Sequence, residues 1–264
     1  MFEAHFGFRA TPFDRQLLPE QFYPSTTLRE LRERLRYAME RAHIMTLTGE
    51  VGAGKSTALR ATVASLPAAL YRFIYLAPPP TGARALYREL LFALHIDPPW
   101  TTPDARRIAR DALTRLKREG QTPVLLVDEA HLLSPAMLEE LRLLTNFEMD
   151  ARSVFALILC GLPELSRRLA SHNHESLAQR IAVRYHLVGM GREETKAYVA
   201  HHLKLAGVER TLFADDALEH LFEFSHGVPR QVNGYALQAL DLAWRQGKDH
   251  VDLKTMEMTT APVD

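Results

Sequence analysis

The feature that most constrains this chain is the segment Gly49-Glu50-Val51-Gly52-Ala53-Gly54-Lys55-Ser56, which matches the pattern G-x-x-x-x-G-K-[ST]. A short apolar run, 44–48, precedes it, and residues 55–65 have the spacing of a helix. Between a strand and a helix, such glycines let the backbone curl so that several N–H groups point at one anion. The helix N-terminus adds the positive end of its dipole. The pattern therefore predicts a phosphate-binding loop.

The chemistry of this loop predicts ATP and Mg²⁺ as its ligands. We expect Lys55 to reach the β- and γ-phosphates and the Ser56 hydroxyl to ligate the metal ion. The glycine order differs from G-x-G-x-x-G, which argues against a dinucleotide-binding oxidoreductase. The candidate nucleotide-binding residues are the loop and the residue after it: Gly49, Glu50, Val51, Gly52, Ala53, Gly54, Lys55, Ser56 and Thr57.

Two carboxylates follow a second apolar run, 124–127. Ligands of open α/β sheets bind at the carboxyl ends of the strands, which is where Asp128 and Glu129 are expected to lie. We expect Asp128 to hold the magnesium ion through water, and Glu129 to orient and polarise the attacking water as a catalytic residue together with Lys55. Asp128-Glu129-Ala130-His131 also spells the box of DEAH helicases, but those need two such α/β domains and this pattern predicts one. His131 is interpreted as a residue at the start of a helix.

Short apolar runs alternate with helical patterns up to about residue 190, and only helical patterns follow. This predicts an α/β fold with a parallel sheet covered by helices, and a C-terminal α-helical domain. The expected parts are an N-terminal strap, 1–26, an ATPase core, 27–190, and a helical lid, 191–264. Strands are expected at 44–48, 71–76, 124–127, 154–160 and 184–188, and helices at 27–42, 55–65, 84–94, 104–118, 135–147, 164–170, 175–181, 192–206, 214–225 and 230–246.

Composition limits the remaining possibilities. Lys and Arg number 32, as do Asp and Glu, so nucleic-acid contact would need a local basic patch. The single cysteine, Cys160, excludes an internal disulfide and is expected to be a small core residue. No signal peptide or membrane-spanning run is evident. The expected protein is soluble and cytoplasmic, with no membrane partner.

Several further segments, together with the two ATP motifs, make the sequence resemble the AAA+ ATPases of the ExeA type. The resemblance runs nearly from end to end. The segments that carry it are Phe6-Gly7-Phe8, Pro12-Phe13, Leu144-Thr145-Asn146-Phe147-Glu148, Gly161-Leu162-Pro163-Glu164-Leu165, Gln179-Arg180-Ile181 and Gly227-Val228-Pro229-Arg230.

The resemblance implies a P-loop NTPase of AAA+ type, with a lid domain and nucleotide bound at the cleft. It implies that Arg230 is the sensor-2 arginine, which touches the γ-phosphate of its own subunit, and that Arg180 is the arginine finger, which reaches a neighbour's ATP. The alternatives are helix capping for Arg230 and a surface salt bridge for Arg180, and Arg184 is a rival finger. A finger in trans requires a homo-oligomer, a ring or a helical filament.

One position departs from the family. Many relatives carry a polar sensor-1 residue after the fourth strand, where this chain has Leu162, which cannot hydrogen bond through its side chain. Either a neighbouring polar residue serves or hydrolysis is slow. Asn146 is a candidate polar contact that withdraws Glu129, and the alternative is an ordinary residue at a helix end.

Two cellular roles fit the resemblance. The first is an accessory ATPase in DNA transposition, like the TniB and TnsC helpers, which binds double-stranded target DNA without sequence specificity and recruits a transposase. The second is an ATPase that supports a secretion or envelope assembly complex. The secretion members carry a membrane span and a cell-wall-binding module after the ATPase, and this sequence ends at Asp264 with neither, which favours the first role. The candidate DNA contacts are Thr81, Arg84 and Arg88, with a further basic set at Arg106, Arg107, Arg110, Arg115, Lys117 and Arg118.

Overall fold

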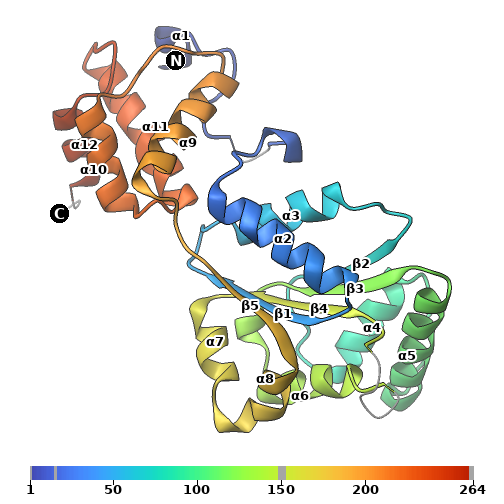
Figure 1. The fold of residues 1–264 in the computed structure, drawn as a ribbon. Coiled ribbons are helices and arrows are strands. Elements are labelled where there is room, and N and C mark those ends of the chain that lie inside the picture. The colour runs from blue at the N-terminus through green and yellow to red at the C-terminus, as the bar shows by residue number, and fades with distance from the viewer. Residues whose placement is uncertain (1, 15–16, 148–152, 262–264) are drawn as a thin grey trace. The chain divides into compact units, whose positions relative to one another are not determined.

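A five-stranded parallel sheet forms the centre of the computed structural model, which describes residues 2–14, 17–147 and 153–261 (Figure 1). The strand order is β2-β3-β4-β1-β5. All residues of β1 and β4 are buried, as expected for strands covered on both faces. This confirms the predicted α/β class. The strands are β1 (Ile44–Gly49), β2 (Tyr71–Leu76), β3 (Thr122–Val127), β4 (Ala156–Gly161) and β5 (Ile181–Leu187).

Helices cover both faces of this sheet. In Figure 1, α2 and α3 lie on one side of it and α4 to α8 on the other. Leu90 and Leu91 of α4 share one buried apolar cluster with Leu125 of β3 and Leu157 of β4. Full burial of such a side chain contributes about 1.5–3 kcal/mol, so this cluster anchors the sheet. The helices are α2 (Thr26–Glu40), α3 (Lys55–Ser65), α4 (Ala83–Ala93), α5 (Thr102–Arg118), α6 (Pro135–Leu144), α7 (Pro163–Leu169) and α8 (Glu175–Arg180).

Two strands begin earlier than the sequence predicted. β3 includes Pro123, which was expected to bound it. Pro123 pairs with β2, whereas pairing with β4 begins only at Val124, so its missing N–H lies where β3 has a single neighbour. β5 begins at Ile181 and not at residue 184. Its buried and exposed residues alternate, as they do in an edge strand that is covered on one face.

Backbone contacts divide the chain into two units. The sheet unit consists of Glu30–Glu50 and Lys55–Leu187, and the helical unit of Met1–Arg29, Val51–Gly54 and Val188–Asp264. The helical unit contains α1 (Phe2–Phe6), α9 (Arg192–Leu205), α10 (Asp215–Ser225), α11 (Pro229–Arg245) and α12 (Leu253–Thr260). No described helix is both long enough and apolar enough to cross a bilayer.

The first residues of the chain pack on the C-terminal helices within the helical unit. Phe6, Phe8 and Phe13 are buried in the apolar cluster formed by α9 to α12. The Phe13 ring stacks on His202, with centroids 5.2 Å apart. The described part of the segment that was expected to be irregular contains a short α-helix, α1, and a 3₁₀ helix, Pro19–Gln21. Helix α1 can form because the first proline comes only at residue 12.

Candidate functional site

The parallel register gathers the predicted nucleotide and metal residues of the sheet unit at one edge. β1 ends at Gly49 and β3 at Val127, directly before Asp128. β4 lies between these strands and ends at Gly161, directly before Leu162. Because all the strands are parallel, their carboxyl ends share an edge, which is where ligands bind in open sheets.

Lys55 opens α3 with its side chain buried. Its Nζ donates to the backbone oxygens of Gly49, at 2.7 Å, and Glu50, at 2.9 Å. No carboxylate lies within ion-pair distance of Nζ in the described ranges. An ammonium has three donors, so one remains, and a buried charge without a counter-ion favours an anionic ligand. The donor set at Lys55 therefore fits a phosphate.

The loop itself has the backbone that a phosphate cradle requires. Gly52 and Gly54 have φ of +82° and +101°, where side chains are strained. A Cβ built on Gly54 meets no heavy atom within 4 Å, so the space beside its backbone is open. Thr57, the last predicted contact, lies in the first turn of α3 and is half-buried.

Arg230 lies beside the tip of the loop, within the helical unit. It follows Pro229, the first residue of α11. Its backbone N–H donates to the oxygen of Gly52 at 3.3 Å, and a Cβ on Gly52 would lie 2.4 Å from the Arg230 Cβ. Gly52 thus permits a close approach that no other residue would permit.

Asp128 is buried and held by three donors. The Ser56 hydroxyl donates to its Oδ2 at 3.3 Å and the Tyr75 hydroxyl to the same oxygen at 2.8 Å, while the backbone N–H of Glu129 donates to Oδ1 at 2.9 Å. The predicted metal residues Ser56 and Asp128 are therefore in contact. A hydroxyl and one carboxylate suit Mg²⁺, which keeps waters and substrate phosphates as its other ligands. No cluster of three His, Cys, Asp or Glu residues suited to a metal ion exists in the part of the chain that the structure describes.

Tyr75 is a contact that the sequence analysis missed. It is the residue before the last of β2. Its pKa is raised to about 12, mainly by burial and then by the neighbouring Asp128 carboxylate. The phenol therefore stays protonated and donates. Cys160 of β4 is buried, as predicted, and burial followed by Asp128 raises the pKa of its thiol. The contact of Tyr75 with Asp128 follows from the pairing of β2 with β3. The sequence alone does not give that pairing.

Glu129 follows Asp128 in the left-handed backbone region, at φ 51° and ψ 34°. Such strain costs a non-glycine residue on the order of 1–2 kcal/mol and concentrates at functional sites. Its Oε2 lies 3.4 Å from Nδ1 of His131, and this is the contact that the structure records for the carboxylate among the described residues. Asn146, the predicted partner, instead has its backbone oxygen bound by Arg110 at 2.6 Å.

Arg180 lies at the opposite end of the sheet, where the strands begin. It ends α8, directly before β5, and its guanidinium donates to Thr145 Oγ1 at 3.4 Å. In the register, Ile181 pairs with Ile44 and Leu187 with Gly49, so about five residues, or about 16 Å, separate Arg180 from the loop along the strand. Arg184, the rival finger, is exposed on β5 and donates to the backbone oxygen of Ala178.

The candidate DNA residues lie around the start of α4. Thr81 is exposed just before the helix, and Arg84 and Arg88 are exposed one turn apart on it. Arg88 pairs with Glu89 at 3.4 Å, in an ion pair that is exposed on both sides.

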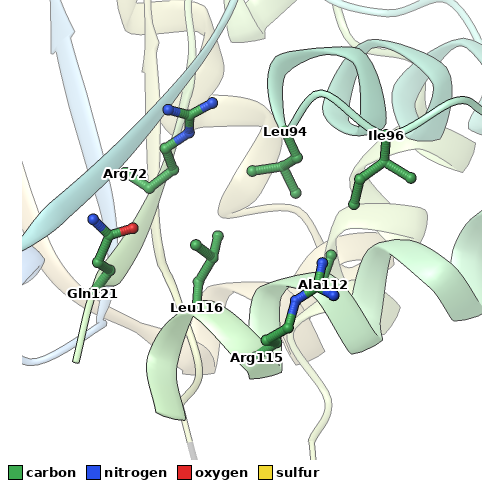
Figure 2. Close-up of a pocket in the computed structure, with 7 residues that line it drawn as sticks. All are labelled: Arg72, Leu94, Ile96, Ala112, Arg115, Leu116 and Gln121. Carbon is green, nitrogen blue, oxygen red and sulfur yellow. The ribbon is translucent and has the colours of Figure 1, made fainter. Parts of the chain in front are cut away.

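A cavity of about 140 Å³ opens at the edge of the sheet where the strands begin (Figure 2). Apolar side chains of Leu94, Ile96 and Leu116 line it, with Arg72 and Gln121 beside the starts of β2 and β3. The Arg72 guanidinium donates to the oxygen of Ala93 at 2.7 Å. This cavity lies at the opposite end of the strands from Lys55 and Asp128.

Comparisons with known proteins show the family of the chain. The family of AAA domains matches residues 25–169. General secretion pathway protein A of Aeromonas hydrophila is 34% identical over 254 residues, which cover 95% of this chain and 46% of that protein. The chain thus spans less than half the length of this curated relative. DNA and a transposase remain predicted partners.

Solved structures resemble the fold at low identity. Cdc6p of Pyrobaculum aerophilum matches with a TM-score of 0.61 and 17% identity, covering 94% of this chain and 68% of that one. The RuvB Holliday junction branch migration motor of Thermotoga maritima matches with a TM-score of 0.57 and 20% identity, covering 94% and 72%. These two similarities concern the fold alone.

Proposed function

The chain belongs to the family of AAA domains, and from this premise we propose that it is a Mg²⁺-dependent ATPase whose copies assemble head to tail to support a secretion or envelope complex. The observation that carries the ATPase proposal is the buried ammonium of Lys55, which has no carboxylate partner among the described residues and lies at the same end of the sheet as Asp128 and Glu129. The 34% identity with a secretion-pathway protein supports the cellular role.

Each residue of the edge has a chemical task in this proposal. Lys55 would neutralise the β- and γ-phosphates, and Ser56 with Asp128 would hold the magnesium ion. The ion, when bound, neutralises charge on the transferred phosphoryl group. Tyr75 keeps the Asp128 carboxylate oriented, and Glu129 accepts a proton from the attacking water or polarises it. Arg230 would contact the nucleotide from the tip of the loop.

The position of Arg180 supports assembly. At about 16 Å along the strand from the loop, it lies too far to reach a phosphate on its own subunit's loop through one side chain. A head-to-tail neighbour could bring its Arg180 to that phosphate, where an arginine is worth about 10³–10⁵-fold in rate. The repeated contact is heterologous, so it builds a ring or an open filament.

Mixing two inactive variants tests this arrangement. Lys55→Ala removes the phosphate contact but keeps Arg180, and Arg180→Ala does the reverse. We expect each variant alone to have little ATPase activity. An equimolar mixture should regain roughly a quarter to a half of the wild-type activity, because mixed assemblies contain sites that have both Lys55 and a neighbour's Arg180. The readout is phosphate release at a fixed total protein concentration.

Arg184→Ala is the matched control, since Arg184 is an exposed arginine four residues away. It is expected to hydrolyse ATP at the wild-type rate. A mixture no more active than the separate variants would contradict a role for Arg180 in trans. Loss of ATP binding in Arg180→Ala would contradict it as well.

DNA binding in transposition is the second candidate. Arg84 and Arg88 support it, because they are exposed one turn apart and can contact phosphates without reading sequence. Sedimentation with duplex DNA in the presence of ATP, ADP or a slowly hydrolysed analogue tests this role. Complementation of cells that lack the protein, scored for secretion of a reporter enzyme and for transposition, separates the two roles. Secretion that is restored by the wild-type protein but not by Lys55→Ala supports the secretion role. Transposition restored without secretion contradicts the secretion role.

A further inference from the structure

His131 is built into a fixed position beside Glu129. It lies in the short 3₁₀ helix Ala130–Leu132, and its side chain is only 10% exposed. Arg168 of α7 donates to the backbone oxygen of His131 and, at 2.5 Å, to that of Leu133. A Cβ on Gly161 would lie 3.1 Å from the His131 backbone nitrogen and 3.3 Å from Nδ1, so a side chain at position 161 would crowd this residue.

One ring nitrogen faces two groups. The backbone N–H of Leu162 donates to His131 Nδ1 at 3.4 Å, and Oε2 of Glu129 lies 3.4 Å from the same atom. A nitrogen that accepts from an N–H has no proton to give, and one that donates to a carboxylate has no lone pair for an N–H. Nδ1 can therefore serve Leu162 or Glu129, but not both at once.

We propose that His131 is a positioning residue for Glu129, and that its Nδ1 couples the carboxylate to the backbone of residue 162. The inference rests on the proposed ATPase function. When Nδ1 carries the proton, it donates to Oε2 and fixes the rotamer of Glu129. When Nδ1 accepts from Leu162, the carboxylate is free to turn. A shift of the β4–α7 junction thereby reaches the water-activating group through one imidazole.

The reach of the side chain provides a test. Asparagine places its amide near the position of Nδ1, whereas glutamine, of similar polarity, places it near Nε2. We expect His131→Gln to lower kcat about 10- to 100-fold with KM for ATP within about twofold, since a misplacement of about 1 Å costs this much. His131→Asn is expected to lower kcat by no more than about threefold. Exposed His172→Gln is the control and should match wild type.

A double-mutant cycle asks whether the effect passes through Glu129. In a Glu129→Gln background, His131→Gln should change the residual rate by less than about twofold, because the carboxylate that it orients is gone. The same variants are measured for binding of a fluorescent ATP analogue, which should stay within about twofold of wild type.

Several results would overturn the inference alone. Equal kcat for His131→Asn and His131→Gln would do so, as would a full additional loss in the Glu129→Gln background or a loss that appears in nucleotide binding. If His131→Gln fails to fold, His131→Asn alone decides, since a loss of tenfold or more in that variant contradicts the role of Nδ1. A wild-type protein with no ATPase activity would overturn the proposed function, and this inference with it.

Discussion

Replacing Glu140 by leucine should destabilise the sheet unit by about 3 kcal/mol. The Glu140 carboxylate joins three helices: the Tyr87 hydroxyl of α4 donates to it, and Arg106 of α5 donates through Nε at 2.9 Å and Nη2 at 2.8 Å. Tyr87 is fully buried and the Glu140 side chain is 10% exposed. The substitution leaves the Tyr87 hydroxyl buried without an acceptor, which costs about 1–3 kcal/mol.

The arginine contributes less to this cost. The Arg106 side chain is 43% exposed, so its guanidinium regains water when the carboxylate is removed. We count about 1 kcal/mol for its lost pair, and a total of about 3 kcal/mol. Since α4 carries Arg84 and Arg88, the same change should loosen the surface proposed to contact DNA.

Urea unfolding monitored by circular dichroism measures the change. Tyr87→Phe in the Glu140→Leu background removes the orphaned hydroxyl and should recover about 1–2 kcal/mol. Glu139→Leu is the matched control, because this half-exposed neighbour pairs with Arg142 on the surface, and it should cost less than about 1 kcal/mol. A Glu140→Leu protein within 1 kcal/mol of wild type, or a double variant no more stable than the single one, would refute the reasoning.

Three further outcomes are expected. Burial, with a smaller contribution from His201, lowers the pKa of His202 from 6.5 to about 4. The unfolded chain therefore binds this proton at a higher pH than the folded chain does, and the free energy of unfolding of the helical unit should fall by about 3 kcal/mol between pH 6.5 and pH 4. Thermal unfolding of His202→Gln should lack this pH dependence. Tyr75→Phe removes a hydrogen bond that orients the Asp128 carboxylate, so the Mg²⁺ concentration that gives half-maximal ATPase activity should rise about fivefold. An unchanged Mg²⁺ concentration would contradict this role of Tyr75. If duplex DNA is bound, alanine at Arg84 and Arg88 should reduce the slope of log affinity against log salt by about 2. The control is Arg36, an exposed arginine of α2 outside the proposed DNA surface, and Arg36→Ala should leave the slope unaltered.

The sequence predicted those parts of the fold whose signals are local. Apolar runs bounded by prolines and glycines predicted every strand, and the bounds of β2 and α3 match the structure. Helix α12 was missed because its threonines and short length weaken the periodic pattern. Its one local signal was Asp252, whose side chain accepts from the N–H of Thr255 at 2.9 Å as an N-cap.

The candidate site divides in the same way. A motif names Lys55, Ser56 and Asp128, because phosphate and metal chemistry requires those residue types at that spacing. Tyr75 and His131 reach the site through strand pairing and through the close approach at Gly161, and both depend on register rather than on neighbours in the chain. A pattern in one sequence carries no record of such contacts.

The leucine at position 162 also has a structural explanation. The family pattern implies a polar side chain there, yet the contact that the structure records is made by the backbone N–H of Leu162 with His131. Every residue except proline supplies that N–H, so the side chain at 162 is free to be apolar while the link to Glu129 persists. The requirement moves instead to Gly161, since any side chain there would press on the His131 backbone at 3.1 Å. In this chain the polar contact with Glu129 is therefore made by the imidazole of His131, in the 3₁₀ helix after β3, and the glycine at the end of β4 gives that residue space, where the family pattern would place a single polar residue.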